Sequence, residues 1–180
     1  MTLSTFGHGT LEQEAFAQIL LDAGVHDLVD IRSFPGSRRN PQFGREAMEQ
    51  WVPDAGIGYT WRQVLGGRRK AVPGSPHVAL RHPSFRAYAD YMETPKFVAG
   101  IDELLAGGPD RTVMCSESVW WRCHRRLVAD YVTLVRGIPV EHLMHDGRSM
   151  AHRVTEGVRR DRDRLVYDVG VMSPLPEIDG

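Results

Sequence analysis

The sequence predicts an α/β fold, a three-layer sandwich in which helices cover both faces of a mostly parallel β-sheet. Short, nearly continuous apolar runs alternate along the chain with segments whose apolar residues recur at helical spacing. Strands of that kind are typical of parallel sheets that are buried on both faces. With 180 residues and no internal repeat, the chain suits a single domain, residues 1–180, better than two.

The first strand, helix and strand follow one another within about thirty residues, which is the length of a βαβ unit. Residues 3–8 predict a strand and residues 11–23 a helix, with Thr10 as its N-cap and Gly24 just after its end. Residues 25–33 contain a nearly continuous apolar run and predict the second strand.

Two long irregular segments follow the second strand. Residues 34–44 and 65–77 are rich in proline, glycine and arginine, which rules out regular structure throughout either segment. Between them, residues 45–52 predict a helix and residues 57–61 a short strand. Loops of this length in a compact domain are usually functional, so both are expected near a binding site.

Two helices are expected next. The first covers residues 84–92, with Ser84 as its N-cap. The second covers residues 96–105 and is preceded by Pro95, which suits the first position of a helix.

The rest of the chain predicts two more strands around one helix. A strand at residues 111–115 leads into a helix that ends near Val135, and residues 140–145 predict the last strand. Residues 153–164 are strongly charged and predict a peripheral helix or a solvated tail, and residues 172–180 predict a frayed end.

Reactive and charged residues stand at the carboxyl ends of three predicted strands. His8 ends the first strand, Asp30 and Arg32 end the second, and Cys115 and Glu117 end the third core strand. Ligands of open α/β sheets bind at the carboxyl ends of the strands. We therefore expect these five side chains at one edge of the sheet, beside the basic loops.

Four of these residues are the predicted catalytic groups: Cys115, Glu117, Asp30 and His8. Two carboxylates at neighbouring strand ends push their pKa values apart, which suits acid–base catalysis. The alternative is an ion pair, Asp30 with Arg32 or Glu117 with Arg125, that only orders the loops. Cys115 suits a nucleophile because a helix N-terminus lowers a thiol pKa, although a cysteine there is often a small buried hydrophobe.

Cationic and aromatic residues near the same edge predict binding of an anionic small molecule or nucleic acid. Arginine and hydroxyl groups suit contacts with phosphate. An indole ring can stack on a base, although core packing is the commoner role of tryptophan. The predicted substrate-binding residues are Arg32, Ser37, Arg38, Arg39, Arg68, Arg125, His124 and Trp120.

Cys115, Cys123 and His124 offer three soft ligands, so a metal or redox site is an alternative use of this segment. Two arguments oppose it. Zinc sites usually have a short spacing between cysteines, whereas seven residues separate these two. If Cys123 and His124 lie on one helix, their side chains point about 100° apart. We therefore predict no metal and no cofactor.

Five segments of the chain, taken together, resemble a known protein family. They are TFGHGT, LVDIRSFPGSRRNPQF, YTWRQVLGG, FRAYADYM and VMCSESVWWRCHRRLVADYV, in that order. They resemble the domain-of-unknown-function 488 family, whose pattern pairs a Cys-x-Glu turn with a following Cys-His-Arg. The resemblance spans residues 5–142 and implies a fold more than an activity; the VWW segment after Glu117 departs from the pattern. The positions that it marks are Asp30, Arg32, Pro35, Ser37, Cys115, Glu117, Cys123, His124 and Arg125.

We expect a cytoplasmic enzyme that acts on a phosphate-bearing substrate, such as a nucleotide, a nucleoside derivative or nucleic acid. Two cysteines without an export signal are typical of a reducing cytosol, and no apolar run approaches membrane length. The formal net charge of −1 excludes a chain-wide basic surface, so anions would be bound locally. The alternatives are a non-catalytic nucleic-acid- or protein-binding module and the metal or redox site.

Overall fold

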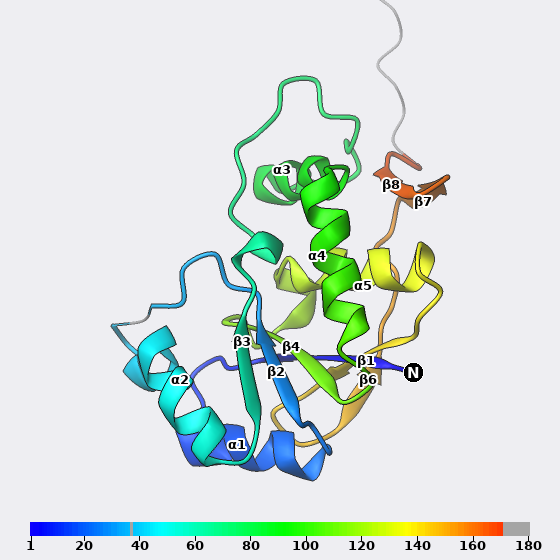
Figure 1. Cartoon of the computed structure of the whole chain (residues 1–180). Helices are drawn as coiled ribbons and strands as arrows, with labels where there is room; N and C mark the ends of the chain where they lie inside the picture. Colours follow the sequence, from blue (N-terminus) through cyan, green and yellow to red (C-terminus); the bar gives the residue numbers. More distant parts are fainter. Residues whose placement is uncertain (37, 171–180) are drawn as a thin grey trace, which may run out of the picture.

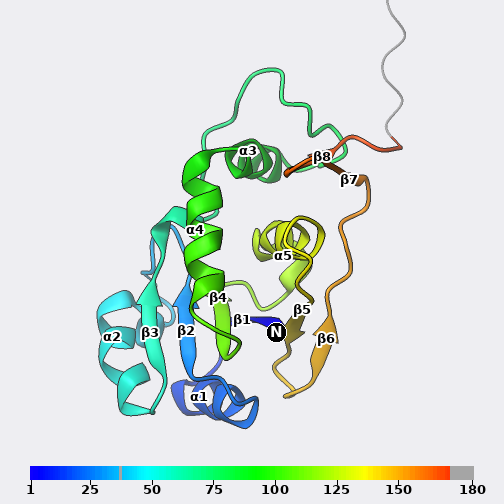
Figure 2. The same cartoon turned by 45° about the vertical axis from the view of Figure 1, so that its right-hand side comes forward.

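The computed structural model describes residues 1–36 and 38–170, and it confirms the predicted three-layer α/β sandwich with a mostly parallel sheet (Figures 1 and 2). The six-stranded sheet has the order β3-β2-β4-β1-β5-β6; its first five strands are parallel, and β6 pairs antiparallel with β5. The strands of this sheet are β1 (Leu3–Gly7), β2 (Asp27–Asp30), β3 (Gly58–Trp61), β4 (Arg111–Cys115), β5 (Val140–Leu143) and β6 (Ser149–Ala151).

Helices cover both faces of the sheet. They are α1 (Gln13–Asp22), α2 (Arg45–Asp54), α3 (Pro83–Met92), α4 (Pro95–Ala106) and α5 (Arg125–Leu134). Neighbouring residues of a strand point to opposite faces, so Leu28 and Met114 pack with α1 and α2, whereas Val29 and Val113 pack with α3, α4 and α5. Both faces are therefore buried, as the apolar runs predict. No helix within residues 1–36 and 38–170 is long and apolar enough to span a membrane.

The central strands are arranged differently from a simple βαβ unit. β1 and β2 are not neighbours, because β4 lies between them and pairs in parallel with both. β1 also pairs with β5, so the N-terminal strand lies inside the sheet.

The start of α4 agrees with the sequence, whereas two predicted helix caps are wrong. α4 begins at Pro95, as expected. The N-cap of α1 is Glu12 rather than Thr10, and it has no side-chain capping bond. α3 begins one residue before Ser84, because Pro83 takes the first helical position and the Nδ1 atom of His82 accepts the hydrogen bond from the Ser84 N–H at 3.3 Å.

The prediction of a helix or solvated tail at residues 153–164 is wrong. This segment leads into an antiparallel hairpin of β7 (Val158–Asp161) and β8 (Arg164–Tyr167). Its tight turn places Arg162 at a φ of 57°. Leu165 and Tyr167 are buried in the core that also contains α3, and this burial holds the charged hairpin in place. The predicted frayed end at residues 172–180 lies outside the described residues.

Candidate functional site

A cavity of about 980 Å³ lies at the carboxyl edge of the sheet, where β1, β2 and β4 end. Parallel pairing sets these ends side by side, with Gly7 of β1 opposite Cys115 of β4 and Asp30 of β2 opposite Met114 of β4. Four of the five strand-end residues singled out in the sequence line the cavity, namely His8, Arg32, Cys115 and Glu117.

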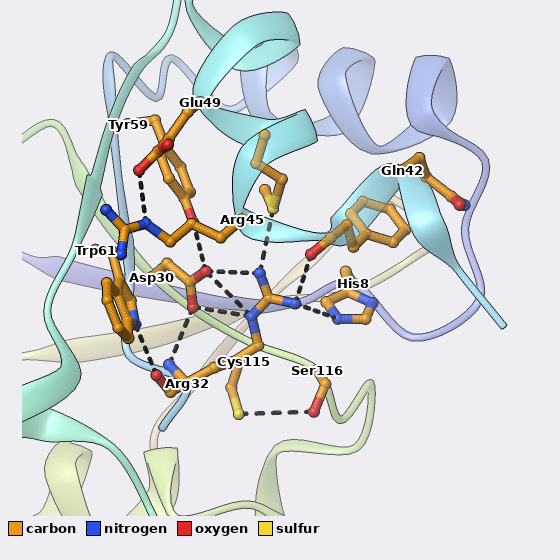
Figure 3. A network of polar contacts seen from close by, with 12 residues as sticks. His8, Asp30, Arg32, Gln42, Arg45, Glu49, Tyr59, Trp61, Cys115 and Ser116 are labelled. Atoms are coloured by element: carbon orange, nitrogen blue, oxygen red, sulfur yellow. Dashed lines mark hydrogen bonds and ion pairs between the residues drawn. The ribbon is translucent and has the colours of Figure 1, made fainter. Parts of the chain in front are cut away.

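The remaining strand-end residue, Asp30, is fully buried in an ion pair with Arg32 (Figure 3). Its Oδ2 atom accepts hydrogen bonds from Arg32 Nη2 at 2.6 Å and from the Tyr59 hydroxyl at 2.7 Å. Its Oδ1 atom accepts from the backbone N–H of Arg32 at 3.0 Å and from Nε at 2.9 Å. The other guanidinium nitrogen, Nη1, donates to the Phe43 carbonyl oxygen at 2.8 Å. Both side chains are fully engaged, which favours the ordering ion pair over the acid–base role of Asp30.

His8 lies against this ion pair and is only 3% exposed. Its Nδ1–H donates to the Gly9 carbonyl oxygen at 2.8 Å, which leaves Nε2 to accept from Arg32 Nη1 at 3.3 Å. The imidazole stacks on the Phe43 ring with centroids 4.3 Å apart. Burial lowers the pKa of His8 to about 4, so the ring is neutral at pH 7 and its lone pair is already used.

The two basic loops meet beside the cavity. The backbone N–H of Arg68 donates to Ser33 Oγ at 2.9 Å, which ties the second loop to the first. The Arg68 guanidinium lies 5.8 Å from the ring centroid of Phe34, and this ring is 69% exposed at the rim. Arg68 therefore lines the cavity, as predicted.

The other predicted residues of the first loop are placed differently. Arg38 and Arg39 are exposed and do not line the cavity, although Gly36 and Asn40 on either side of them do. Ser37 lies outside the described residues.

Arg125 is 1% exposed and lies beneath the Cys-x-Glu turn. Its Nη2 atom donates to the backbone carbonyl of Glu117, and Nη1 donates to Thr5 Oγ1 at 3.4 Å. A Cβ atom on Gly7 would overlap the same Glu117 carbonyl, so the turn packs directly on the end of β1. Arg125 thus holds the Glu117 backbone and leaves the carboxylate exposed at the cavity rim.

Trp120 is buried rather than available to a ligand, with 7% of its surface exposed. Its ring stacks on His142 with centroids 4.0 Å apart and an interplanar angle of 8°. This packing fits the alternative core role of Trp120.

The segment between Cys115 and α5 contains a short 3₁₀ turn, Trp120–Arg122, and the helix begins only at Arg125. Cys123 is extended, with a ψ of 151°, and His124 precedes the first helical residue. The assumption that Cys123 and His124 share a helix is therefore wrong. His124 Nδ1 lies 3.9 Å from Cys115 Sγ and 3.6 Å from Cys123 Sγ.

The two thiols differ in their electrostatic surroundings. Cys123 Sγ accepts the backbone N–H of Arg125 at 3.5 Å, at the N-terminus of α5. Burial raises the pKa of Cys123, but the neighbouring Cys115 thiol and the contacts with Arg125 outweigh it and lower that pKa overall. The neighbouring Cys123 thiol, together with burial, raises the pKa of Cys115. Of the two, Cys123 is the better site for a thiolate.

A chain of buried polar groups lies behind this segment. Asp130 Oδ1 is 2.8 Å from His152 Nε2, and His152 Nδ1 is 3.0 Å from His142 Nε2. The other ring nitrogen of His142, Nδ1, is 2.7 Å from Thr5 Oγ1. Asp130 Oδ2 also accepts from the Tyr167 hydroxyl at 3.0 Å. Burial lowers the pKa of His142 to about 3, so this ring is neutral in the folded protein.

The lining residues outside the predicted set include Phe34, Arg122 and His145. His145 follows β5, and its Nε2–H donates to the Gly7 carbonyl oxygen at 2.7 Å, so the strand-end rule applied to the last strand would have found it. Phe34 and Arg122 have no such signal, because their positions depend on how the loops fold over the sheet.

Comparison with known proteins identifies one family. The family described as Domain of unknown function DUF488 matches residues 12–132. No curated protein and no solved structure matches the chain.

Proposed function

The chain belongs to the DUF488 family, and because that description names no activity, we propose from the cavity that the protein is an enzyme acting on a phosphate-bearing substrate. One observation carries the proposal. Among the described lining residues are four arginines and one carboxylate, and the guanidinium groups of Arg68 and Arg122 have no hydrogen-bond or ion-pair partner within residues 1–36 and 38–170. Unpaired guanidinium groups at a concave surface favour an anion, and phosphate accepts their paired N–H donors.

Phe34 supports a substrate that also carries a base. Its exposed ring lies at the rim beside Arg68, so a planar ring could stack on it while a phosphate contacts the arginine. Stacking of a base on an aromatic side chain is worth about 1–3 kcal/mol and tolerates different bases. The substrate class that fits both features is a nucleotide or the end of a nucleic-acid strand.

Glu117 is the acid–base group in this proposal. Its carboxylate is exposed at the rim, and its backbone is fixed by Arg125. The sulfur atoms of Cys115 and Cys123 and the imidazole of His124 line the same cavity and supply its reactive groups. The two free thiols suit a reducing compartment, which supports a cytoplasmic location.

The test compares binding of a nucleoside monophosphate, its nucleoside and inorganic phosphate by titration calorimetry. Charge-assisted hydrogen bonds contribute about 1.5–3 kcal/mol each, so Arg68→Ala and Arg122→Ala should each weaken monophosphate binding by roughly tenfold or more. The nucleoside should bind more weakly than the monophosphate and lose further affinity in Phe34→Ala.

Arg153→Ala is the matched control, since Arg153 is an exposed arginine outside this cavity and its loss should leave affinity unchanged. Equal weakening by all three arginine variants, or no binding of any phosphate compound, contradicts the proposal. Turnover that survives Glu117→Gln contradicts the acid–base assignment. Unchanged binding without turnover of any bound compound would instead support the non-catalytic nucleic-acid-binding alternative.

A further inference from the structure

We propose that Cys115, Cys123 and His124 form a zinc site whose fourth coordination position faces the cavity. The ligand atoms are the two Sγ atoms and His124 Nδ1, which all lie within 4.8 Å of one another. This inference does not depend on the proposed substrate, because metal binding can be measured with no other ligand present.

The distances fit a tetrahedral ion. Zinc lies about 2.3 Å from sulfur and about 2.0–2.1 Å from nitrogen, so a sulfur and a nitrogen ligand of one tetrahedral zinc are about 3.6 Å apart. His124 Nδ1 lies 3.6 Å from Cys123 Sγ and 3.9 Å from Cys115 Sγ. A small rotation of the Cys115 side chain would bring the three atoms onto one ion.

The three ligand atoms are also available to a metal. Their mutual contacts of 3.6–3.9 Å are weak hydrogen bonds that a zinc ion would replace. Two further contacts of the sulfur atoms are compatible with a metal. The Arg125 backbone N–H donates to Cys123 Sγ at 3.5 Å and would remain as an outer hydrogen bond to the bound sulfur, and Ser116 Oγ lies 4.0 Å from Cys115 Sγ. Such outer contacts orient metal ligands and are common around zinc.

The surrounding fold holds the imidazole in place. The Tyr88 ring meets His124 edge to face with centroids 5.0 Å apart. On the other side, a Cβ atom on Gly67 would lie 2.6 Å from His124 Nδ1, so the glycine allows the loop backbone to close against the ring. The position of the imidazole is therefore set by packing on both sides before a metal arrives.

The number of protein ligands indicates the kind of site. Structural zinc sites usually have four protein ligands, whereas catalytic sites have three and leave one position for water or substrate. All three residues here line the cavity, and the exposed Glu117 stands two residues after Cys115 on the same rim. The fourth position therefore opens to the space that contains the unpaired arginines.

The experiment measures metal binding by the whole reduced chain under anaerobic conditions. Cobalt(II) is titrated in first, as a spectroscopic substitute for zinc, and zinc is then added against a chelating indicator. We expect one equivalent of cobalt, with thiolate-to-metal charge-transfer bands and the intense visible bands of tetrahedral coordination, and full displacement by one equivalent of zinc.

Four variants assign the ligands. Cys115→Ser, Cys123→Ser and His124→Gln should each lose the tetrahedral spectrum and weaken zinc binding at least about tenfold, the loss associated even with outer-shell changes. His145→Gln is the control, because His145 lines the same cavity outside the cluster and should leave the spectrum unchanged. Circular dichroism of each variant without metal shows whether the fold is retained, and His124→Gln tests the site if a cysteine variant is unfolded.

Two results would overturn the zinc site. The first is an octahedral cobalt spectrum, or none, in the reduced wild-type protein. The second is a tetrahedral spectrum that survives in folded His124→Gln. Neither result bears on phosphate binding by Arg68 and Arg122, so failure of the zinc site and failure of the proposed function can be told apart.

Discussion

The two walls of the cavity are built in opposite ways. On the β2 wall, both carboxylate oxygens of Asp30 accept hydrogen bonds and the Arg32 guanidinium is fully engaged. On the wall formed by β4 and the start of α5, the contacts are long: His124 Nδ1 lies 3.6 Å from Cys123 Sγ and 3.9 Å from Cys115 Sγ, and the Arg125 backbone N–H lies 3.5 Å from Cys123 Sγ. The fully bonded ion pair therefore belongs to the scaffold, whereas the weakly paired atoms are the groups still able to bind a ligand.

The largest expected effect comes from breaking the Asp30–Arg32 ion pair of the β2 wall. Asp30→Asn leaves Arg32 as an unpaired buried cation, and removal of one partner of a buried ion pair costs about 3–5 kcal/mol. Urea denaturation should therefore show a fall of that size in the free energy of unfolding. Tyr59→Phe removes one hydrogen bond to the same carboxylate and should cost only about 0.5–3 kcal/mol. If Asp30→Asn keeps its stability and loses activity instead, Asp30 is catalytic after all.

A smaller effect is expected from a substitution that disturbs His124, on the wall formed by β4 and the start of α5. In Gly67→Ala, the added Cβ would lie 2.6 Å from His124 Nδ1, so either the loop or the ring must move. Overpacking of this kind costs about 1–3 kcal/mol, and displacement of the ring should also weaken cobalt binding. Gly36→Ala is the control, because Gly36 lines the same cavity and, apart from its chain neighbours, its Cβ would meet no atom of the described residues within 4 Å. Equal effects of the two substitutions would contradict the packing role of Gly67.

The smallest effect depends on pH and concerns His142, which belongs to the chain of buried polar groups behind Cys115 and Cys123. Burial lowers the pKa of His142 to about 3, below the value of about 6.5 expected in the unfolded chain. Between these values the unfolded state binds a proton that the folded state excludes. The contribution of His142 to the free energy of unfolding is therefore fully present above about pH 6.5. It falls by about 1.4 kcal/mol per pH unit as the pH decreases from there towards about pH 3.

The measurement is the free energy of unfolding at several values between pH 7 and pH 5. His142→Gln should reduce the dependence on pH, although its stability at pH 7 will be lower because the ring stacks on Trp120. His26→Gln, at an exposed position, should leave the dependence unchanged. An identical pH dependence in wild type and His142→Gln would show that His142 does not contribute to it.

The sheet and its edge could be predicted from the sequence because their signals are local. The apolar run around Leu28 and Val29 marks a strand buried on both faces, and Pro95 marks the start of a helix. The strand-end rule then brings His8 and Cys115 to one cavity without further information.

Other features depend on contacts between distant segments. The sequence around Asp30 does not show that both of its carboxylate oxygens have hydrogen-bond partners, since one of these partners is Tyr59 on the neighbouring strand β3. The 3₁₀ turn Trp120–Arg122, which delays the start of α5 until Arg125, has no local propensity signal, and its Trp120 ring stacks on His142 of the distant strand β5. The C-terminal hairpin was missed because residues 153–164 are strongly charged, and the apolar residues that bury it, Leu165 and Tyr167, come only after that segment.

The position of β1 inside the sheet has a consequence for synthesis on the ribosome. Ser4 pairs with Thr112, 108 residues later, and the other neighbour of β1 is β5, which is made later still. Before β4 has been made, the only strand pair of the six-stranded sheet that a nascent chain can form is β2 with β3. At that stage β1 has no neighbouring strand, and the core residue Phe6 that it carries lacks the packing of the finished sheet. Such exposure of apolar surface during synthesis is where chaperones act, so this fold should assemble late, as its second half leaves the ribosome.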